Sequence, residues 1–340
     1  MRRPRPRAIQ IQVTCIDDLL GTDHAALRSL LETRFPDVRF CITRIDPIIL
    51  DGGQPPAYEM MKQIYSLLSP TGRREDAVNL ICGEGELTHR SELFAVLEQM
   101  GMEVRQIYDC RTFDEFLNMA SSRLNLVTAV PGEKAAAMMA DTLGIPWVYA
   151  PTSHRLEDIR RAYADTAAAL GRPLPDLSPY EDAVREKIER TRSHLDGMPI
   201  VVDRSASMRP LVLARALVEY GFHVKMAFDG IILPCDLPTL EWFRTQHPEI
   251  TVEDARRFDM RELKNTLGPC MAIGPSIGYL MDAPHVVEFP EPWATYGYHG
   301  VELLMDKMFR AADTEADYAR IRAESEIWQP VECRRGGCGI

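Results

Sequence analysis

Short apolar runs of strand length alternate with amphipathic stretches of helical period along most of this chain. The apolar runs occupy residues 8–15, 38–43, 77–82, 103–108, 125–130, 146–150, 199–203, 223–228, 270–273 and 285–289. Helical periodicity lies between most of them, for example at 91–100, 133–143, 156–170 and 210–220. This alternation predicts an α/β fold with doubly wound parallel sheets.

Two stretches divide the alternation into three αβα units. Residues 69–76 (SPTGRRED) are polar and turn-rich, and a helical stretch at 179–195 ends in DGMP before another apolar run. We therefore predict a partial N-terminal unit at 1–72, a middle domain at 73–177, a helical connection at 178–195, a C-terminal domain at 196–312, and a helical segment with a flexible tail at 313–340. The first unit is expected to be incomplete, because it shows fewer strands than a doubly wound unit normally has.

The composition is ordinary for a soluble globular protein. The net charge, the length of the apolar runs and the cysteines argue against several classes of function. The net charge of −11 argues against non-specific binding to nucleic acid or to an anionic membrane. No apolar run approaches the length of a membrane span, and the N-terminal arginines precede no secretory signal. The eight cysteines are scattered and lie mostly in apolar runs, so we expect reduced thiols and a cytoplasmic protein.

Cys15 stands where a thiolate would be stabilised. It ends the first strand-like run, and Asp17 and Asp18 are positioned to cap an amphipathic helix over 19–33. The carboxyl end of a strand beside the positive end of a helix favours the ionised thiol. The alternative for a lone cysteine is a buried and inert thiol.

Three further motifs are candidates for contact with a small-molecule cofactor or substrate. Gly83, Glu84 and Gly85 form a turn after a strand, although the carboxylate would repel a phosphate, and the alternative is an ordinary βα turn. Ser205 lies in another strand-to-helix turn, where the alternative is a helix cap. His299 lies in the aromatic sequence YGYHG, which suits a pocket wall or, alternatively, a capped helix start.

The C-terminal sequence CRRGGCGI places Cys333 and Cys338 among glycines. Such a flexible segment is compatible with a metal-binding clip or with two exposed, redox-active thiols. Elsewhere the histidines and cysteines do not show the spacing of zinc ligands.

Five stretches carry a further signal when they are read in order: QIQVTCIDDLLGTD, VNLICGEGELTHRSELF, LGIPWVYAPTSHRLEDIRRAY, IVVDRSASMRPLVLARALVEYGFHV and MAIGPSIGYLMDAPHVVEFPEPWATYGYHG. Together they resemble the nitrogenase component 1 type oxidoreductases over about residues 5–312. The resemblance implies a subunit of three αβα domains that pairs with a homologous component 1 type subunit, as a homodimer or heterodimer. It also implies that electrons arrive from a P-loop ATPase iron–sulfur reductase.

In the family, the cysteine of the Thr-Cys segment usually binds a [4Fe–4S] cluster shared at the subunit interface, which by resemblance makes Cys15 a metal ligand. One thiolate does not hold such a cluster. Family chains usually carry a further N-terminal stretch with one or two cluster cysteines, which we do not find here. The other ligands are therefore expected from a partner subunit, from a second copy, or from a weaker candidate such as Cys41, Cys333 or Cys338. The alternatives are that the start of the sequence is assigned too late, or that the chain has lost the cluster.

The resemblance also bears on the substrate. Where the nitrogenase catalytic subunit has a cofactor-ligating cysteine, this chain has Thr128 and Ala129, so dinitrogen reduction is not expected. The leading hypothesis is an iron–sulfur electron-transfer oxidoreductase subunit. The alternative is a non-catalytic scaffold or accessory protein for assembly of a metallocluster or tetrapyrrole cofactor, and a plain small-molecule binding module is a third class.

Overall fold

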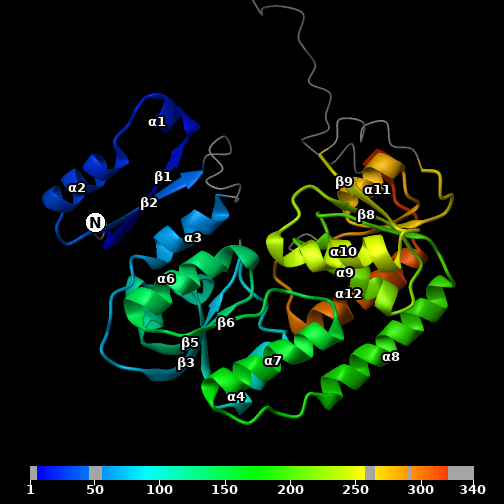
Figure 1. Cartoon of the computed structure of the whole chain (residues 1–340), viewed down its shortest axis with the longest axis horizontal. Helices are drawn as coiled ribbons and strands as arrows, with labels where there is room; N and C mark the ends of the chain where they lie inside the picture. The colour runs from blue at the N-terminus through cyan, green and yellow to red at the C-terminus, as the bar shows by residue number, and fades with distance from the viewer. Residues whose placement is uncertain (1–5, 46–55, 84, 257–264, 290–292, 321–340) are drawn as a thin grey trace, which may run out of the picture. The chain divides into compact units, whose positions relative to one another are not determined.

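The computed structural model describes residues 6–45, 56–83, 85–256, 265–289 and 293–320 (Figure 1). The chain forms two compact units. Unit 1 comprises Met1–Glu186 and Glu291–Leu303, and unit 2 comprises Lys187–Pro290 and Leu304–Ile340. Two long helices, α8 (Ser178–Leu195) and α12 (Gly297–Ala312), each run from one unit into the other.

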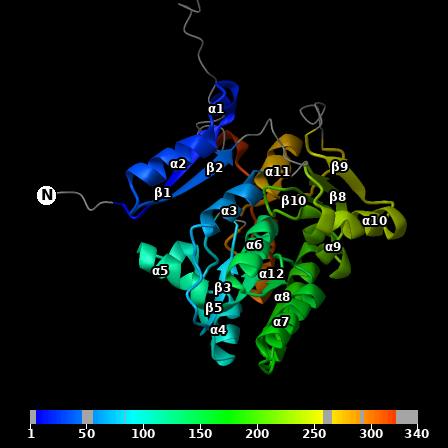
Figure 2. The same ribbon diagram turned by 60° about the vertical axis from the view of Figure 1, so that its left-hand side comes forward.

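Unit 1 begins with a two-stranded parallel sheet of β1 (Ala8–Thr14) and β2 (Arg39–Ile45). The connection between them holds α1 (Cys15–Leu19) and α2 (His24–Arg34). After β2, α3 (Ala57–Tyr65) packs against both β2 and α6 (Glu133–Leu143), so it joins this sheet to the next one (Figure 2).

The helix predicted over 19–33 is wrong at its start. Asp17 and Asp18 lie inside the short α1, and the Asp17 carboxylate accepts the Thr14 N–H at 2.8 Å. Gly21 then adopts a left-handed φ of 68°, which ends this first turn. Asp23 caps α2 by accepting the Ala26 N–H at 2.9 Å.

The second sheet of unit 1 has four parallel strands in the order β4-β3-β5-β6. Its strands are β3 (Glu75–Ile81), β4 (Glu103–Gln106), β5 (Ser122–Val127) and β6 (Trp147–Tyr149). The helices of this sheet are, besides α6, α4 (Glu92–Gln99), α5 (Phe113–Asn118) and α7 (Leu156–Leu170). Three short 3₁₀ turns lie between them: η2 (Ile107–Asp109), η3 (Met119–Ser121) and η4 (Val130–Gly132). The buried strand residues Ile81 and Val127 pack against Met139 of α6 and Tyr65 of α3.

The sheet of unit 2 has five parallel strands in the order β11-β10-β7-β8-β9. They are β7 (Ile200–Val202), β8 (Val224–Asp229), β9 (Thr251–Asp254), β10 (Met271–Ile273) and β11 (His285–Val287). The intervening helices are α9 (Pro210–Glu219), η5 (Pro234–Asp236), α10 (Leu237–Gln246) and α11 (Pro275–Met281).

The predicted α/β fold with parallel sheets is confirmed, because each strand pair in the described part of the chain is parallel. One strand, β9, escapes sequence reasoning because its residues Thr-Val-Glu-Asp include a single apolar side chain. As an edge strand that pairs only with β8, it tolerates polar residues on both faces. Within the same described ranges, none of the helices combines the length and apolar character that a bilayer crossing requires.

Candidate functional site

Each of the two larger sheets has a point at which its strand order reverses. In unit 1 this point lies between β3 and β5, and in unit 2 it lies between β7 and β10. Doubly wound sheets bind ligands outside the carboxyl ends of the strands at such points. Gly83 and Gly85, which follow β3, and Ser205, which follows β7, lie at these edges, whereas Glu84 lies outside the described residues.

Aromatic side chains hold the glycine turn after β3. The Tyr108 hydroxyl donates a hydrogen bond to the Gly83 carbonyl at 2.8 Å. The Trp293 indole lies so close to Gly85 that a Cβ at this position would overlap the ring. Gln106, which is fully buried, accepts the Leu87 N–H at 3.0 Å and donates to the Leu87 carbonyl at 3.2 Å. Glycine is therefore required at position 85, because the Trp293 ring packs directly against the backbone of the turn.

The Ser205 hydroxyl forms hydrogen bonds within unit 2. Its hydroxyl donates to Asp203 Oδ1 at 2.5 Å and accepts the Ser276 N–H at 3.2 Å. Asp203 Oδ2 accepts the Ile277 N–H at 2.7 Å, so the two side chains together cap α11. Burial raises the pKa of Asp203, and the hydrogen bonds from Ser205 and Ile277 oppose that rise. Ser205 therefore caps a helix, as the alternative interpretation of the sequence stated. The capped helix is α11, far along the chain, and not α9, the next helix in the sequence.

His299 belongs to a capped helix start. Its backbone N–H donates to Glu92 Oε2 at 3.0 Å, and the Tyr298 N–H donates to Glu92 Oε1 at 2.6 Å. The Tyr163 hydroxyl donates to the same Oε1 at 2.7 Å. Glu92 is only 6% exposed, so a single buried carboxylate accepts three hydrogen bonds at the start of α12. Sequence reasoning missed Glu92, because nothing near it in sequence indicates its partners.

The aromatic residues around His299 form a packed layer. Tyr298 stacks between Tyr163, with ring centres 6.0 Å apart, and Tyr180, at 6.3 Å. The Tyr298 hydroxyl donates to Glu181 Oε1 at 2.8 Å. Burial raises the pKa of Tyr163, Tyr296 and Tyr298 above the ordinary range, so these phenols stay protonated. This cluster orders the start of α12 and does not form a pocket wall of titrating groups.

Cys15 is the first residue of α1 and is half-buried. The side chains that follow it are exposed and apolar: Ile16 is 63% exposed, Leu19 82% and Leu20 76%. A thiol beside such a surface is accessible to another protein chain.

Cys41 differs from Cys15 in both burial and position. It is fully buried in β2, and burial raises the pKa of its thiol to about 11. The strand register places Cys41 opposite Gln10, whereas Cys15 directly follows Thr14. Cys15 and Cys41 are therefore four or five residues apart along the strand direction, which corresponds to about 13–17 Å. This distance is too large for both thiols to bind one cluster.

The described residues of one chain do not fit a complete iron–sulfur cluster. Within the described ranges, no group of three or more His, Cys, Asp or Glu side chains could hold a metal ion. A [4Fe–4S] cluster takes four ligands. Cys333 and Cys338 lie outside the described residues. Among the described residues, Cys15 could therefore supply one ligand of such a cluster, and the other ligands would have to come from outside the described part of this chain or from another chain.

Iodoacetamide applied to the native protein at about pH 8 is expected to alkylate Cys15 and to spare Cys41 and Cys82. Burial raises the pKa of the Cys41 thiol to about 11 and that of Cys82 to about 12, so both hold little thiolate at that pH. Mass spectrometry of the labelled peptides measures the difference, and denatured protein, in which all thiols react, is the control. Labelling of Cys41 as fast as Cys15 would contradict the burial described here.

Comparison with known proteins places this arrangement in a family. A family model described as nitrogenase component 1 type oxidoreductase matches residues 1–323. A solved structure described as "Nitrogenase Cp1 at pH 6.5" superposes with a TM-score of 0.71 at 16% identity, covering 94% of this chain and 77% of that chain. This similarity shows the shared fold.

No curated protein matches this sequence. The aspartate transcarbamoylase of Trypanosoma cruzi, in complex with N-(phosphonacetyl)-L-aspartic acid, gives a TM-score of 0.29 at 15% identity, covering 77% of this chain and 90% of that chain. A score this low supports no structural argument.

Proposed function

This chain belongs to the nitrogenase component 1 type oxidoreductase family, and we propose that it is one subunit of an iron–sulfur electron-transfer oxidoreductase. In this proposal the chain pairs with a homologous component 1 type subunit and receives electrons from a P-loop ATPase iron–sulfur reductase. Cys15 is one ligand of a [4Fe–4S] cluster at the interface of the two subunits. The cluster would supply one-electron transfer, and the chain would supply the thiolate and the surface around it.

The apolar surface beside Cys15 is the observation that carries this proposal. Ile16, Leu19 and Leu20 are each more than 60% exposed and lie within five residues of Cys15 in the sequence. Leu30, within α2, and Phe35, directly after α2, are also exposed, at 64% and 46%. Grouped apolar side chains on a soluble protein mark an interaction surface. A partner that covers this surface would bring its own ligands next to Cys15.

The sheet beneath this surface supports the same conclusion. Parallel sheets are normally covered on both faces by helices. Here the described sheet consists of β1 and β2 alone, and α2, which packs on β2, buries none of its side chains. We infer that another subunit completes the burial of this part of unit 1.

Thr128 supports the proposal that the substrate is not dinitrogen. It directly follows β5, is 3% exposed, and its hydroxyl donates to the Ile81 carbonyl at 3.4 Å. A buried hydroxyl that is engaged with the backbone does not replace a thiolate as a ligand to a metallocluster. This residue therefore would not hold a metallocluster in the way that the cofactor-ligating cysteine of the nitrogenase catalytic subunit does, in keeping with a substrate other than dinitrogen.

Substitution of both Leu19 and Leu20 by arginine is expected to prevent subunit pairing. The two charges would enter an interface that is otherwise apolar, and desolvating them is costly. Size-exclusion chromatography with light scattering, on the chain alone and mixed with a second component 1 type subunit, measures the change. Leu237→Arg, at a leucine of α10 that is 54% exposed in unit 2, is the matched control. A wild-type chain that stays monomeric in both samples would contradict the pairing.

Anaerobic purification of the paired subunits tests the proposed activity itself. Iron and acid-labile sulfide in the complex, together with ATP-dependent electron transfer from the reductase, are the expected results. Iron binding without electron transfer would instead support the accessory role in cofactor assembly. A complex without iron would remove the cluster from the proposal.

A further inference from the structure

A groove in unit 2 is lined by residues of α8 and α12. The two helices run side by side in the same direction and are joined by an ion pair and, seven residues further along, by a contact between a histidine and an aspartate. Lys187 Nζ lies 2.8 Å from Asp306 Oδ2, and His194 Nε2 lies 3.1 Å from Asp313 Oδ1. Between these pairs is a groove of about 380 Å³. A volume of this order is typical of sites for small molecules.

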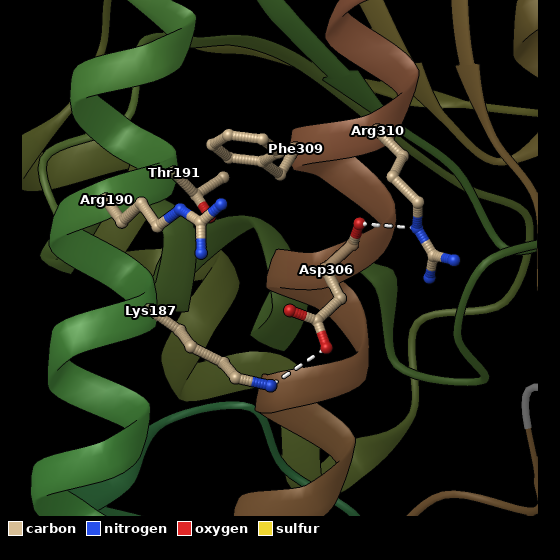
Figure 3. A pocket seen from close by; sticks show the side chains of 6 residues that line it. All are labelled: Lys187, Arg190, Thr191, Asp306, Phe309 and Arg310. Carbon is tan, nitrogen blue, oxygen red and sulfur yellow. Dashed lines mark hydrogen bonds and ion pairs between the residues drawn. The ribbon is translucent and has the colours of Figure 1, made fainter.

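The groove carries an excess of positive charge in a chain whose net charge is −11. Its lining residues are Lys187, Arg190, Thr191, Asp306, Phe309 and Arg310. Figure 3 shows Lys187 and Arg190 reaching from α8 toward α12, whereas the Arg310 side chain leaves the opposite side of α12. The one carboxylate, Asp306, is already paired with Lys187.

Arg190 is held ready for an anion. Its guanidinium carbon lies 4.5 Å from the centre of the Phe309 ring. His194 also stacks on this ring, with centres 4.1 Å apart and planes 19° apart, so Phe309 has a fixed orientation. Among the described residues no acceptor takes a hydrogen bond from Arg190. Stacking on an aromatic face leaves the in-plane N–H groups of a guanidinium directed outward, in the geometry that binds two oxygens of an anion.

Helix-end electrostatics account for Arg310 but not for Arg190. Basic side chains in the last turn of a helix stabilise its negative end, and the effect is confined to that turn. Arg310 is in the last turn of α12, and its Nε donates to the Asp306 carbonyl at 3.0 Å. In α8 the last turn holds Arg192 and His194, and Arg190 precedes it. The position of Arg190 is therefore not explained by helix-end electrostatics, and its contact among the described residues is the Phe309 ring.

We propose that this groove binds a phosphoryl group, with Arg190 as the bidentate donor and Lys187 as the second cation. The volume admits a phosphate monoester as well as free phosphate. With Arg190 and His194 both already in contact with the Phe309 ring, the groove is not suited to an aromatic base, so the recognised chemistry is the dianion itself. This site is independent of the proposed electron transfer and stands whether or not the chain binds a cluster.

Isothermal titration calorimetry of the full chain with inorganic phosphate, and separately with glycerol 3-phosphate, tests the site. Saturable binding at one site is expected, and tighter binding of the ester would identify a phosphorylated metabolite as the ligand. Arg190→Gln should weaken binding about tenfold or more, because two charge-assisted hydrogen bonds are lost. Arg310→Gln, which removes the same charge from a side chain on the opposite side of α12, should change binding by less than about threefold.

Asp306→Asn separates ligand binding from a structural role. It removes the competing carboxylate from beside Lys187, so phosphate should bind more tightly to this variant, which a merely structural ion pair would not predict. The inference is overturned if neither phosphate compound shows saturable binding, or if Arg190→Gln binds as wild type does. Binding of an acidic peptide, with no binding of phosphate, would also overturn it and would assign the groove to a protein partner.

Discussion

The Cys15→Ala subunit, reconstituted anaerobically with its partner, is expected to lose most of the visible iron–sulfur absorbance and the corresponding iron. The expectation follows from the position of Cys15, which is half-buried at the start of α1 beside the exposed side chains of Ile16 and Leu19. The fold should persist, since removal of one partly buried sulfur lowers the free energy of unfolding by about 1 kcal/mol. Absorbance, iron content and circular dichroism on the same sample distinguish loss of a ligand from loss of structure.

Cys110→Ala is the matched control for this experiment. Cys110 is also half-buried, and its thiol lies 3.5 Å from the Gln106 carbonyl, so the substitution removes a comparable sulfur elsewhere in unit 1. It should leave the iron content unchanged. The double variant Cys333→Ala/Cys338→Ala tests the C-terminal cysteines in the same way. If that variant loses iron and Cys15→Ala keeps it, the assignment of Cys15 as a metal ligand is wrong.

Glu92→Ala is expected to lower the free energy of unfolding of unit 1 by about 3 kcal/mol or more. The substitution leaves the N–H groups of Tyr298 and His299 and the Tyr163 hydroxyl without their acceptor. Each buried donor without a partner costs about 1–3 kcal/mol. Glu92→Gln keeps one carbonyl oxygen and should lose about half as much.

Two measurements make this prediction specific. Urea unfolding gives the free-energy change, and hydrogen exchange at the amides of Tyr298 and His299 reports the start of α12 directly. Glu98→Ala, at an exposed glutamate of the same helix α4, should change stability by less than about 0.5 kcal/mol. Unchanged amide protection in Glu92→Ala would mean that the cap is not formed in solution.

Local patterns are sufficient to predict most of the fold, because the physical signals are themselves local. The stretches 133–143 and 156–170 coincide with α6 and α7, each of which ends at a left-handed glycine, Gly144 or Gly171. The helix over 19–33 fails at its start because the Gly21 turn and the Asp23 cap outweigh the apolar periodicity. The strand β9 is not predicted from the sequence, because an edge strand needs few apolar side chains.

The candidate sites are less predictable, because their partners are far apart in sequence. A capping role is readable at Ser205 and at His299, yet the groups that complete the two caps lie 71 and 207 residues away. No periodicity or motif in the sequence links Glu92 to His299. The groove of Arg190 and Phe309 depends in the same way on the parallel alignment of α8 with α12, which only the three-dimensional structure supplies.

The division of unit 1 into two separated stretches of chain affects how the protein is made on the ribosome. Tyr298 is synthesised 206 residues after Glu92, which at about 5–20 residues per second takes about ten to forty seconds. During this interval the Glu92 carboxylate and the Tyr163 ring have emerged without the segment that covers them. Unit 1 therefore completes its core only after the whole sheet of unit 2 has been translated, and until then its nascent form leaves part of that core uncovered.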